Sequence, residues 1–209
     1  MQLDSFHPLT KSDLPAAVDA LDDAFHEDVL WRRVFEGVGD TELRRKAFFE
    51  CPLRYGLTYG KVYAGSSKLE GIAVWLPGRR ADMSLWGMLR SGAIVPGMRL
   101  GKEVASRLKI LSDTLGPDRN RHMKGRRYVY LMIIGVVRAH QGEGVGGRLL
   151  RAIASECDAQ GLPLYLETET ENNVPFYEKH GFEVLKRVML PELDIPMWEM
   201  VREPLPVTS

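Results

Sequence analysis

Hydrophobic residues recur along the chain at two different spacings, which predicts a mixture of helices and strands. In the C-terminal half, the segment 144–160 has the spacing of an amphipathic helix, with an apolar residue at every fourth position: Val145, Leu149, Ile153 and Cys157. Gly161 ends this helix and Pro163 blocks its continuation. The nearly continuous apolar segment 128–137 before it predicts a strand that is covered on both faces.

The N-terminal half predicts a strand, several helices and a hairpin. The strand covers 2–9, and the helices cover 10–25, 28–36 and 41–59, the last with an interruption near Pro52. Two short runs rich in Val, Tyr, Ile and Trp, at 61–64 and 71–76, flank Gly-Ser-Ser-Lys-Leu-Glu and predict the hairpin.

Helical periodicity over 82–92 and 98–115 predicts a helical insert, 78–126, between the hairpin and the central strand. After residue 160 we expect a strand, a short helix and two further strands, over 162–168, around Tyr177, over 182–190 and over 197–202. At 209 residues the chain fits a single domain, 1–209.

The turn after the central strand has four glycines within 142–147 and opens directly into the helix. Such a turn directs backbone N–H groups and the positive end of the helix dipole at one point, where an anion such as a phosphate binds. Two patterns fit it. One is Gly-x-Gly-x-x-Gly of dinucleotide-binding proteins, at Gly142, Gly144 and Gly147. The other is Gln-x-x-Gly-x-Gly, at Gln141, Gly144 and Gly146.

The surroundings of the turn distinguish the two patterns. A dinucleotide site also needs an acidic residue about 20 positions further on, and Glu167 stands there. However, a dinucleotide fold usually continues through several βα repeats, and only 62 residues follow Gly147. An NAD(P)-binding oxidoreductase is therefore the less favoured alternative.

A second motif follows one strand later, where Asn173 precedes Pro175, Phe176 and Tyr177 on a short helix that leads to Gly181-Phe182. Together the two motifs resemble the GCN5-related N-acetyltransferase (GNAT) superfamily over about residues 125–203. The sequence Asn-x-Pro-Phe-Tyr at 173–177 resembles the motif of the small-molecule branch that includes puromycin N-acetyltransferase. Asn173 lies four residues before Tyr177, whereas seven is common in the superfamily.

The resemblance implies an α/β (α+β) fold with a mixed, mostly antiparallel sheet of seven strands, flanked by helices and with the helical insert between strands 3 and 4. It also implies transfer of an acetyl group from acetyl-CoA, the cosubstrate, to a primary amine of a small molecule by direct attack on the thioester. A non-catalytic regulator of the same fold that binds acyl-CoA remains an alternative.

The resemblance further implies which residues bind the cofactor. The backbone of Ile134, Val136 and Val137 would face it beside a bulge, for which Gly135 is the candidate. The loop would hold its pyrophosphate, through Arg138, Gln141, Gly142, Glu143, Gly144, Val145 and Gly146. Asn173 and Tyr177 complete the expected cofactor site.

Tyr177 is the candidate general acid, since a phenol can return a proton to the departing thiolate. Glu167 is our candidate for the general base, and three other carboxylates stay open: Glu27, Asp28 and Glu169. We expect aromatic residues to recognise the acceptor, namely Phe25, Trp31 and Phe35 near the N-terminus and Trp86 in the insert.

Composition narrows the remaining possibilities. The net charge is zero, which favours neither nucleic acid nor an anionic membrane as a partner. The segment 79–127, however, holds 12 basic and 4 acidic residues and could cover an anionic ligand. Cys51 and Cys157 have no metal-binding or disulfide spacing and are expected as small buried hydrophobes. No metal site, signal peptide or membrane span is apparent, so we expect a cytoplasmic protein, with a homodimer as a further expectation.

Overall fold

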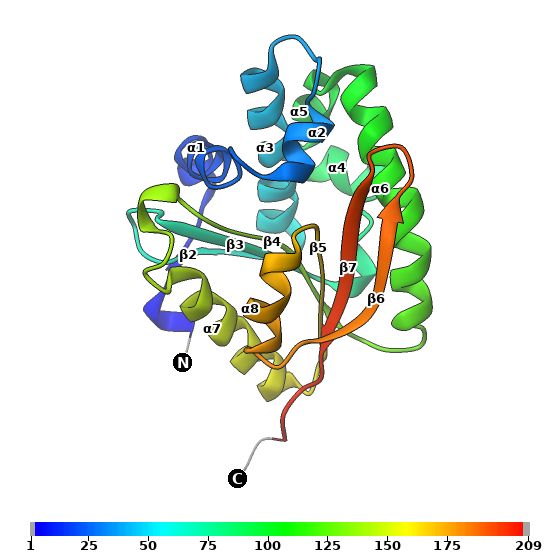
Figure 1. Cartoon of the computed structure of the whole chain (residues 1–209). Coiled ribbons are helices and arrows are strands. Elements are labelled where there is room, and N and C mark those ends of the chain that lie inside the picture. The colour runs from blue at the N-terminus through cyan, green and yellow to red at the C-terminus, as the bar shows by residue number, and fades with distance from the viewer. Residues whose placement is uncertain (1–2, 207–209) are drawn as a thin grey trace.

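The computed structural model describes residues 3–206 and is built on one sheet in the order β1-β2-β3-β4-β5-β7-β6 (Figure 1). Its seven strands are His7–Pro8 (β1), Lys61–Ala64 (β2), Gly71–Pro77 (β3), Val129–Val136 (β4), Leu164–Thr168 (β5), Glu183–Leu190 (β6) and Ile195–Arg202 (β7). Neighbouring strands are antiparallel apart from β4 and β5. This arrangement confirms the predicted fold class, and it excludes the parallel sheet of a dinucleotide-binding fold.

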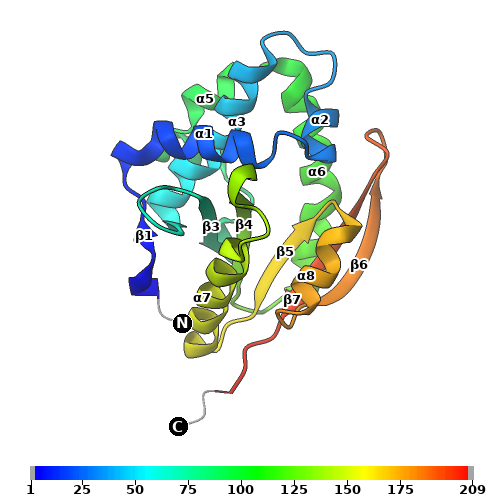
Figure 2. The same cartoon turned by 60° about the vertical axis from the view of Figure 1, so that its left-hand side comes forward.

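Helices cover both faces of the sheet (Figures 1 and 2). Three precede β2: Leu14–Ala24 (α1), Val29–Val34 (α2) and Thr41–Tyr59 (α3). Three form the insert between β3 and β4: Leu85–Ser91 (α4), Ile94–Arg99 (α5) and Gly101–His122 (α6). Val145–Gln160 (α7) follows β4, and Val174–Glu178 (α8) follows β5.

Strand β3 shows how the two faces are filled. Ile72 and Val74 pack with α1 and α3, whereas Ala73 and Trp75 pack with α7, as the twofold alternation of a strand requires. Both sets are buried because helices cover the sheet on either side. Among residues 3–206, no helix is long and apolar enough to cross a membrane.

Three predicted elements differ from the structure. Of the strand expected over 2–9, only His7–Pro8 pairs with β2, and residue 2 lies outside the described residues. Helix α3 runs through Pro52 without a break, because Phe49 and Leu53 on either side of it are fully buried against α1 and the sheet. The insert contains three helices where two were expected.

The two central strands, β4 and β5, separate soon after they begin. Their register covers only Val129–Leu164 and Tyr130–Tyr165. Figure 2 shows β5, β7 and β6 turning away from β3 and β4 as a second wing of the sheet. From Leu131 onward, the edge of β4 that faces β5 is therefore open within the described structure.

The bulge in β4 lies at Met132, so our prediction of Gly135 was wrong. The register steps from Val74–Ile133 to Trp75–Leu131, which leaves Met132 as the additional residue, whereas Gly135 pairs regularly with Ile72. Gly135 has a different function. A Cβ atom there would lie 2.7 Å from Cε2 of Phe25 and 3.2 Å from Cβ of Ala24, so the glycine lets α1 approach the sheet.

Replacing Gly135 with alanine should therefore destabilise the protein by about 1–3 kcal/mol, the usual cost of overpacking a core. Urea denaturation would measure this loss. Gly39→Ala is the matched control, because a Cβ atom at Gly39 meets nothing within 4 Å and the backbone there is not left-handed. Equal stability of the two variants would contradict the close packing of α1 on β4.

Candidate active site

The glycine loop after β4 forms an anion-binding geometry. Gly142 and Gly144 have left-handed backbones, with φ of 84° and 77°, which residues with a side chain rarely adopt. Helix α7 begins directly after Gly144, and its intrahelical bonding starts with the Arg148 N–H, 3.0 Å from the Gly144 carbonyl. The N–H groups of the first turn, from Val145 to Gly147, therefore lack partners within the helix and point out of its positive end.

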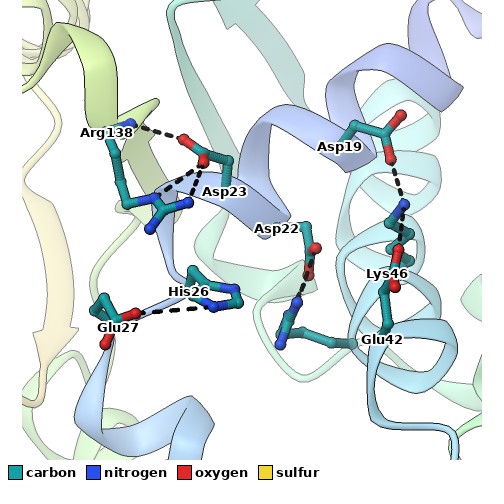
Figure 3. Close-up of polar contacts among 9 residues, drawn as sticks. Asp19, Asp22, Asp23, His26, Glu27, Glu42, Lys46 and Arg138 are labelled. Carbon is teal, nitrogen blue, oxygen red and sulfur yellow. Dashed lines mark hydrogen bonds and ion pairs between the residues drawn. The ribbon is translucent and has the colours of Figure 1, made fainter.

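Arg138, which we expected at the phosphate site, instead binds Asp23 of helix α1 in this structure. Its backbone N–H donates to Oδ2 of Asp23 at 2.8 Å, and its Nε donates to Oδ1 at 3.0 Å (Figure 3). This bridge lowers the pKa of Asp23, chiefly through the backbone hydrogen bond from Arg138. The start of the glycine loop is thus attached to α1.

Helix α1 is in turn attached to α3 by ion pairs. Asp22 forms a two-point pair with Arg45, and Lys46 Nζ lies 2.9 Å from Asp19 Oδ1 and 3.0 Å from Glu42 Oε1 (Figure 3). The three aspartates of α1 therefore connect the loop after β4 to the N-terminal helices.

The open edge of β4 offers backbone groups to a ligand. The N–H of Val137 donates to Glu70 O at 2.9 Å and its carbonyl accepts from the His140 N–H, so the expectation for Val137 was wrong. Because groups alternate along an antiparallel strand, those of Val136 and Ile134 point to the opposite, open edge. Gln141 Nε2 donates to the Val136 carbonyl at 3.0 Å, which leaves the Val136 N–H facing that edge.

Glu143 lies in the same loop but turns its side chain along the surface. Its carboxylate lies 3.0 Å from Nδ1 of His140, and its carbonyl accepts from Nη1 of Arg148 at 3.2 Å. Glu143 therefore supports the loop from outside.

A cavity of about 730 Å³ opens where β4 and β5 separate. Residues 131–134 of β4 and 166–169 line it from the sheet, and α2, α3 and the insert helices close it from above. Phe25 and Trp31 line the cavity as expected for acceptor recognition. Phe35 instead packs into the core beside α6, and Trp86 is 74% exposed and is not among the lining residues.

A buried ion pair forms the polar floor of this cavity. Arg119 of α6 donates from Nη1 to Oε1 of Glu167 at 2.7 Å, and both side chains are almost fully buried, 7% and 5% exposed. Asp82 pairs with the other guanidinium nitrogen, and the Tyr130 ring lies 4.8 Å from the guanidinium carbon. Glu167, our candidate base, therefore already binds a cation, although burial raises its pKa.

Arg119, Asp82 and Tyr130 were not among the predicted site residues. Arg119 continues the apolar stripe of α6 formed by Leu108, Leu111 and Leu115, all of which line the cavity. A charge on the apolar face of a helix was the signal that could have revealed it.

A second carboxyl group, Glu169, lies just beyond β5. Burial, followed by the nearby Asp28, raises its pKa well above the ordinary value, and the two side chains share a hydrogen bond. A protonated Glu169 carboxyl can donate this hydrogen bond to Asp28. Asp28 also caps α2, since its Oδ1 accepts from the Trp31 N–H at 3.2 Å.

Tyr177 lines the cavity beside Glu169 and is 8% exposed. Burial and then the Glu169 carboxylate raise its pKa, so the phenol keeps its proton across the physiological range. Phe176 and Phe182 hold its ring edge to face, with centroids 5.2 and 5.6 Å away. Asn173 also lines the cavity, and its Nδ2 donates to Oγ1 of Thr168 at 3.1 Å.

Both cysteines are buried, as predicted, and burial raises the pKa of each to about 12. Residues 3–206 contain no group of three or more His, Cys, Asp or Glu side chains that could hold a metal ion. The polar side chains that line the cavity include carboxyl groups, a guanidinium group and a phenol.

Comparison with known proteins agrees with this geometry. The family model "Acetyltransferase (GNAT) domain" matches residues 114–184. An uncharacterised N-acetyltransferase of Schizosaccharomyces pombe is 34% identical over 145 residues, 64% of this chain and 56% of that protein. One of Bacillus subtilis is 34% identical over 79 residues, 36% of this chain and 54% of that protein.

A solved structure from Corynebacterium glutamicum, described as histone acetyltransferase HPA2 and related acetyltransferase, shares the fold. It has a TM-score of 0.65 at 22% identity, over 98% of each chain. The chain spans about half the length of the curated relatives it matches. Residues 114–184 thus match the GNAT acetyltransferase domain in sequence, and residues 3–206 share the fold of a solved acetyltransferase.

A buried carboxyl behind the cavity makes stability depend on pH. Glu199 of β7 is the register partner of Glu167 on the neighbouring strand β5, has no exposed surface, and its Oε2 lies 3.1 Å from Nε2 of His122. Burial, then Asp118, raises its pKa from 4.5 to about 7. The folded state thus favours protonated Glu199, and this stabilisation is complete below pH 4.5 and is lost as the pH rises through 7.

Between pH 5 and 8, the free energy of unfolding should fall by up to about 3 kcal/mol relative to Glu199→Gln, which cannot ionise. Urea denaturation at several pH values measures the difference. The exposed Glu183→Gln is the control and should follow the original protein. Parallel pH curves for the original protein and Glu199→Gln would show that Glu199 ionises as freely when folded as when unfolded.

Proposed function

We propose that the protein is an acetyl-CoA-dependent N-acetyltransferase that acetylates a primary amine of a small molecule. The observation that carries this proposal is the separation of β4 from β5, which brings an open backbone edge, Tyr177 and Glu169 to one cavity. The glycine loop lies at the end of the same strand. The match of residues 114–184 to the GNAT acetyltransferase domain supports acetyl transfer as the reaction.

The loop fits the pyrophosphate of coenzyme A. Backbone N–H groups of Gly142 and of the first turn of α7 bind phosphate oxygens, and the helix dipole favours their negative charge. The backbone of Ile134 and Val136 bonds the amides of the pantetheine arm along the open edge. Since the Val136 N–H faces this edge, it also stabilises the negative oxygen that develops on the thioester carbonyl.

Glu169 and Asp28 are the best candidates for the base. An alkylamine is mostly protonated near neutrality and must lose a proton before it attacks. Glu169 lies in the cavity beside Tyr177 and can take that proton as it passes its own to Asp28 through their hydrogen bond, whereas Glu167 is held by Arg119. Glu169, and not Glu167, is therefore the proposed proton acceptor. The role of Glu167 is to hold Arg119 in place.

Tyr177 completes the reaction. The amine nitrogen forms a bond to the acetyl carbon, the carbon–sulfur bond breaks, and the thiolate takes the phenolic proton. The protonated state of Tyr177 at neutral pH supports this assignment. The helices of the insert enclose the cavity, which favours a small-molecule acceptor over a protein tail. The sequence Asn-x-Pro-Phe-Tyr at 173–177 favours the same class of acceptor.

Release of the free thiol from acetyl-CoA across a panel of primary amines tests the function. Tyr177→Phe should lower kcat by about 10²-fold, typical for loss of an acid catalyst, with little change in acetyl-CoA affinity. Tyr59→Phe, which lies outside the cavity, is the control. Binding of CoA without turnover on any amine would favour the non-catalytic regulator instead.

Gly144→Ala should weaken CoA binding about tenfold, because a side chain in the left-handed region costs about 1–2 kcal/mol and disturbs the loop. Gly161→Ala is a close control. Gly161 caps the other end of α7, also has a positive φ, and has no atom within 4 Å of an added Cβ. Isothermal titration calorimetry should show weaker binding for Gly144→Ala alone, and equal affinities would place CoA elsewhere.

A further inference from the structure

We propose that the acceptor is a primary amine with a bulky apolar body, aromatic or branched aliphatic, and that polyamines and aminosugars are poor acceptors. This inference rests on the proposed acetyl transfer and specifies its substrate class. The cavity, its aromatic wall and the position of its charged groups support it.

The size and lining of the cavity fit an apolar body. About 730 Å³ lies within the range of cavities that enclose small organic ligands, about 300–1,000 Å³. Aromatic side chains from the N-terminal helices form one wall: Phe25, Trp31, Phe48 and Phe49. Aliphatic and thioether side chains of the insert form the opposite wall: Met83, Leu85, Met88, Ile94, Leu108 and Leu111.

The aromatic wall is a packed unit. Trp31 lies 4.3 Å from Phe48 and 6.1 Å from Phe49 between ring centroids, and Phe25 stacks on Phe49 at 5.4 Å. Rings arranged in this way present a rigid apolar surface, against which a flat or branched hydrocarbon gains most. A sugar or a polyamine would leave its polar groups unpaired on this wall.

The charges of the cavity provide one place for an ammonium group. Arg119 is already paired with Glu167 and Asp82, and Lys109 with Asp113. Glu169 lines the cavity beside Tyr177, where the amine must lie to react, and its carboxyl group is hydrogen-bonded to Asp28. A second ammonium group, as in a polyamine, would face the apolar walls, and the loss of its hydration opposes binding.

Binding and turnover of four amines by the full chain test the proposal: tryptamine, 2-phenylethylamine, putrescine and spermidine. The two arylalkylamines should bind on the order of 30- to 100-fold more tightly than the polyamines, as expected from burial of one ring. Quenching of tryptophan fluorescence or calorimetry measures binding of 2-phenylethylamine, and thiol release measures turnover. The alcohol 2-phenylethanol should bind more weakly than 2-phenylethylamine, because it lacks the charge.

Two pairs of variants locate the site. Trp31→Ala should weaken binding of 2-phenylethylamine at least about tenfold, whereas Trp86→Ala, with an exposed ring outside the cavity, should not. Glu169→Gln should remove the preference for the amine over the alcohol, whereas the exposed Glu171→Gln should keep it. Unchanged CoA binding through the glycine loop shows that each variant is folded.

The outcomes separate this inference from the proposed function. Preferential binding and acetylation of polyamines would overturn the apolar acceptor and leave acetyl transfer standing. Failure of both arylalkylamines to bind, or equal loss in Trp31→Ala and Trp86→Ala, would also overturn it. Binding of arylalkylamines at Trp31 and Glu169 without thiol release on any amine would support the pocket assignment and overturn the proposed acetyl transfer.

Discussion

The separation of β4 from β5 beyond Tyr130 is the constraint on which the site depends. It leaves one edge of β4 without a strand, so that the backbone of Ile134 and Val136 can bond a ligand instead. It also admits the side chains that follow β5 into the space between the strands. A sheet paired to its end would have neither an open edge nor a cavity. Substrate binding here therefore depends on hydrogen bonds that the sheet does not form.

Helix α6 places charged side chains at that opening and on the outer wing of the sheet. Arg119 binds Glu167 at the floor of the cavity, and Asp118 pairs with Lys186 of β6 on the outer wing. Part of the positive charge of the insert, which suggested a cover for phosphate groups, is used in such contacts. Arg107, for example, donates to the carbonyls of Val34 and Glu36 at 2.8 and 2.7 Å. In this structure the insert supplies part of the cavity wall.

Sequence and structure agree where the signal is local. The glycine loop, helix α7 with its cap at Gly161, and Tyr177 on its short helix follow from turn chemistry and periodicity within a few residues. The contacts that complete the site join distant positions. Arg119 and Glu167 are 48 residues apart, and Arg138 and Asp23 are 115 apart. No local pattern reveals such pairs. The bulge at Met132 escaped for a similar reason, because it depends on register with β3.

The cavity wall and the glycine loop are built from different parts of the chain. The glycine loop, 141–147, contributes nothing to the described cavity wall, whereas the insert and the N-terminal helices supply most of it. Under the proposed function, mutations in those helices would alter which amines are accepted and leave binding of acetyl-CoA at the loop unchanged. Such independence lets a lineage diversify its chemistry by drift and selection in one region while the other stays constant.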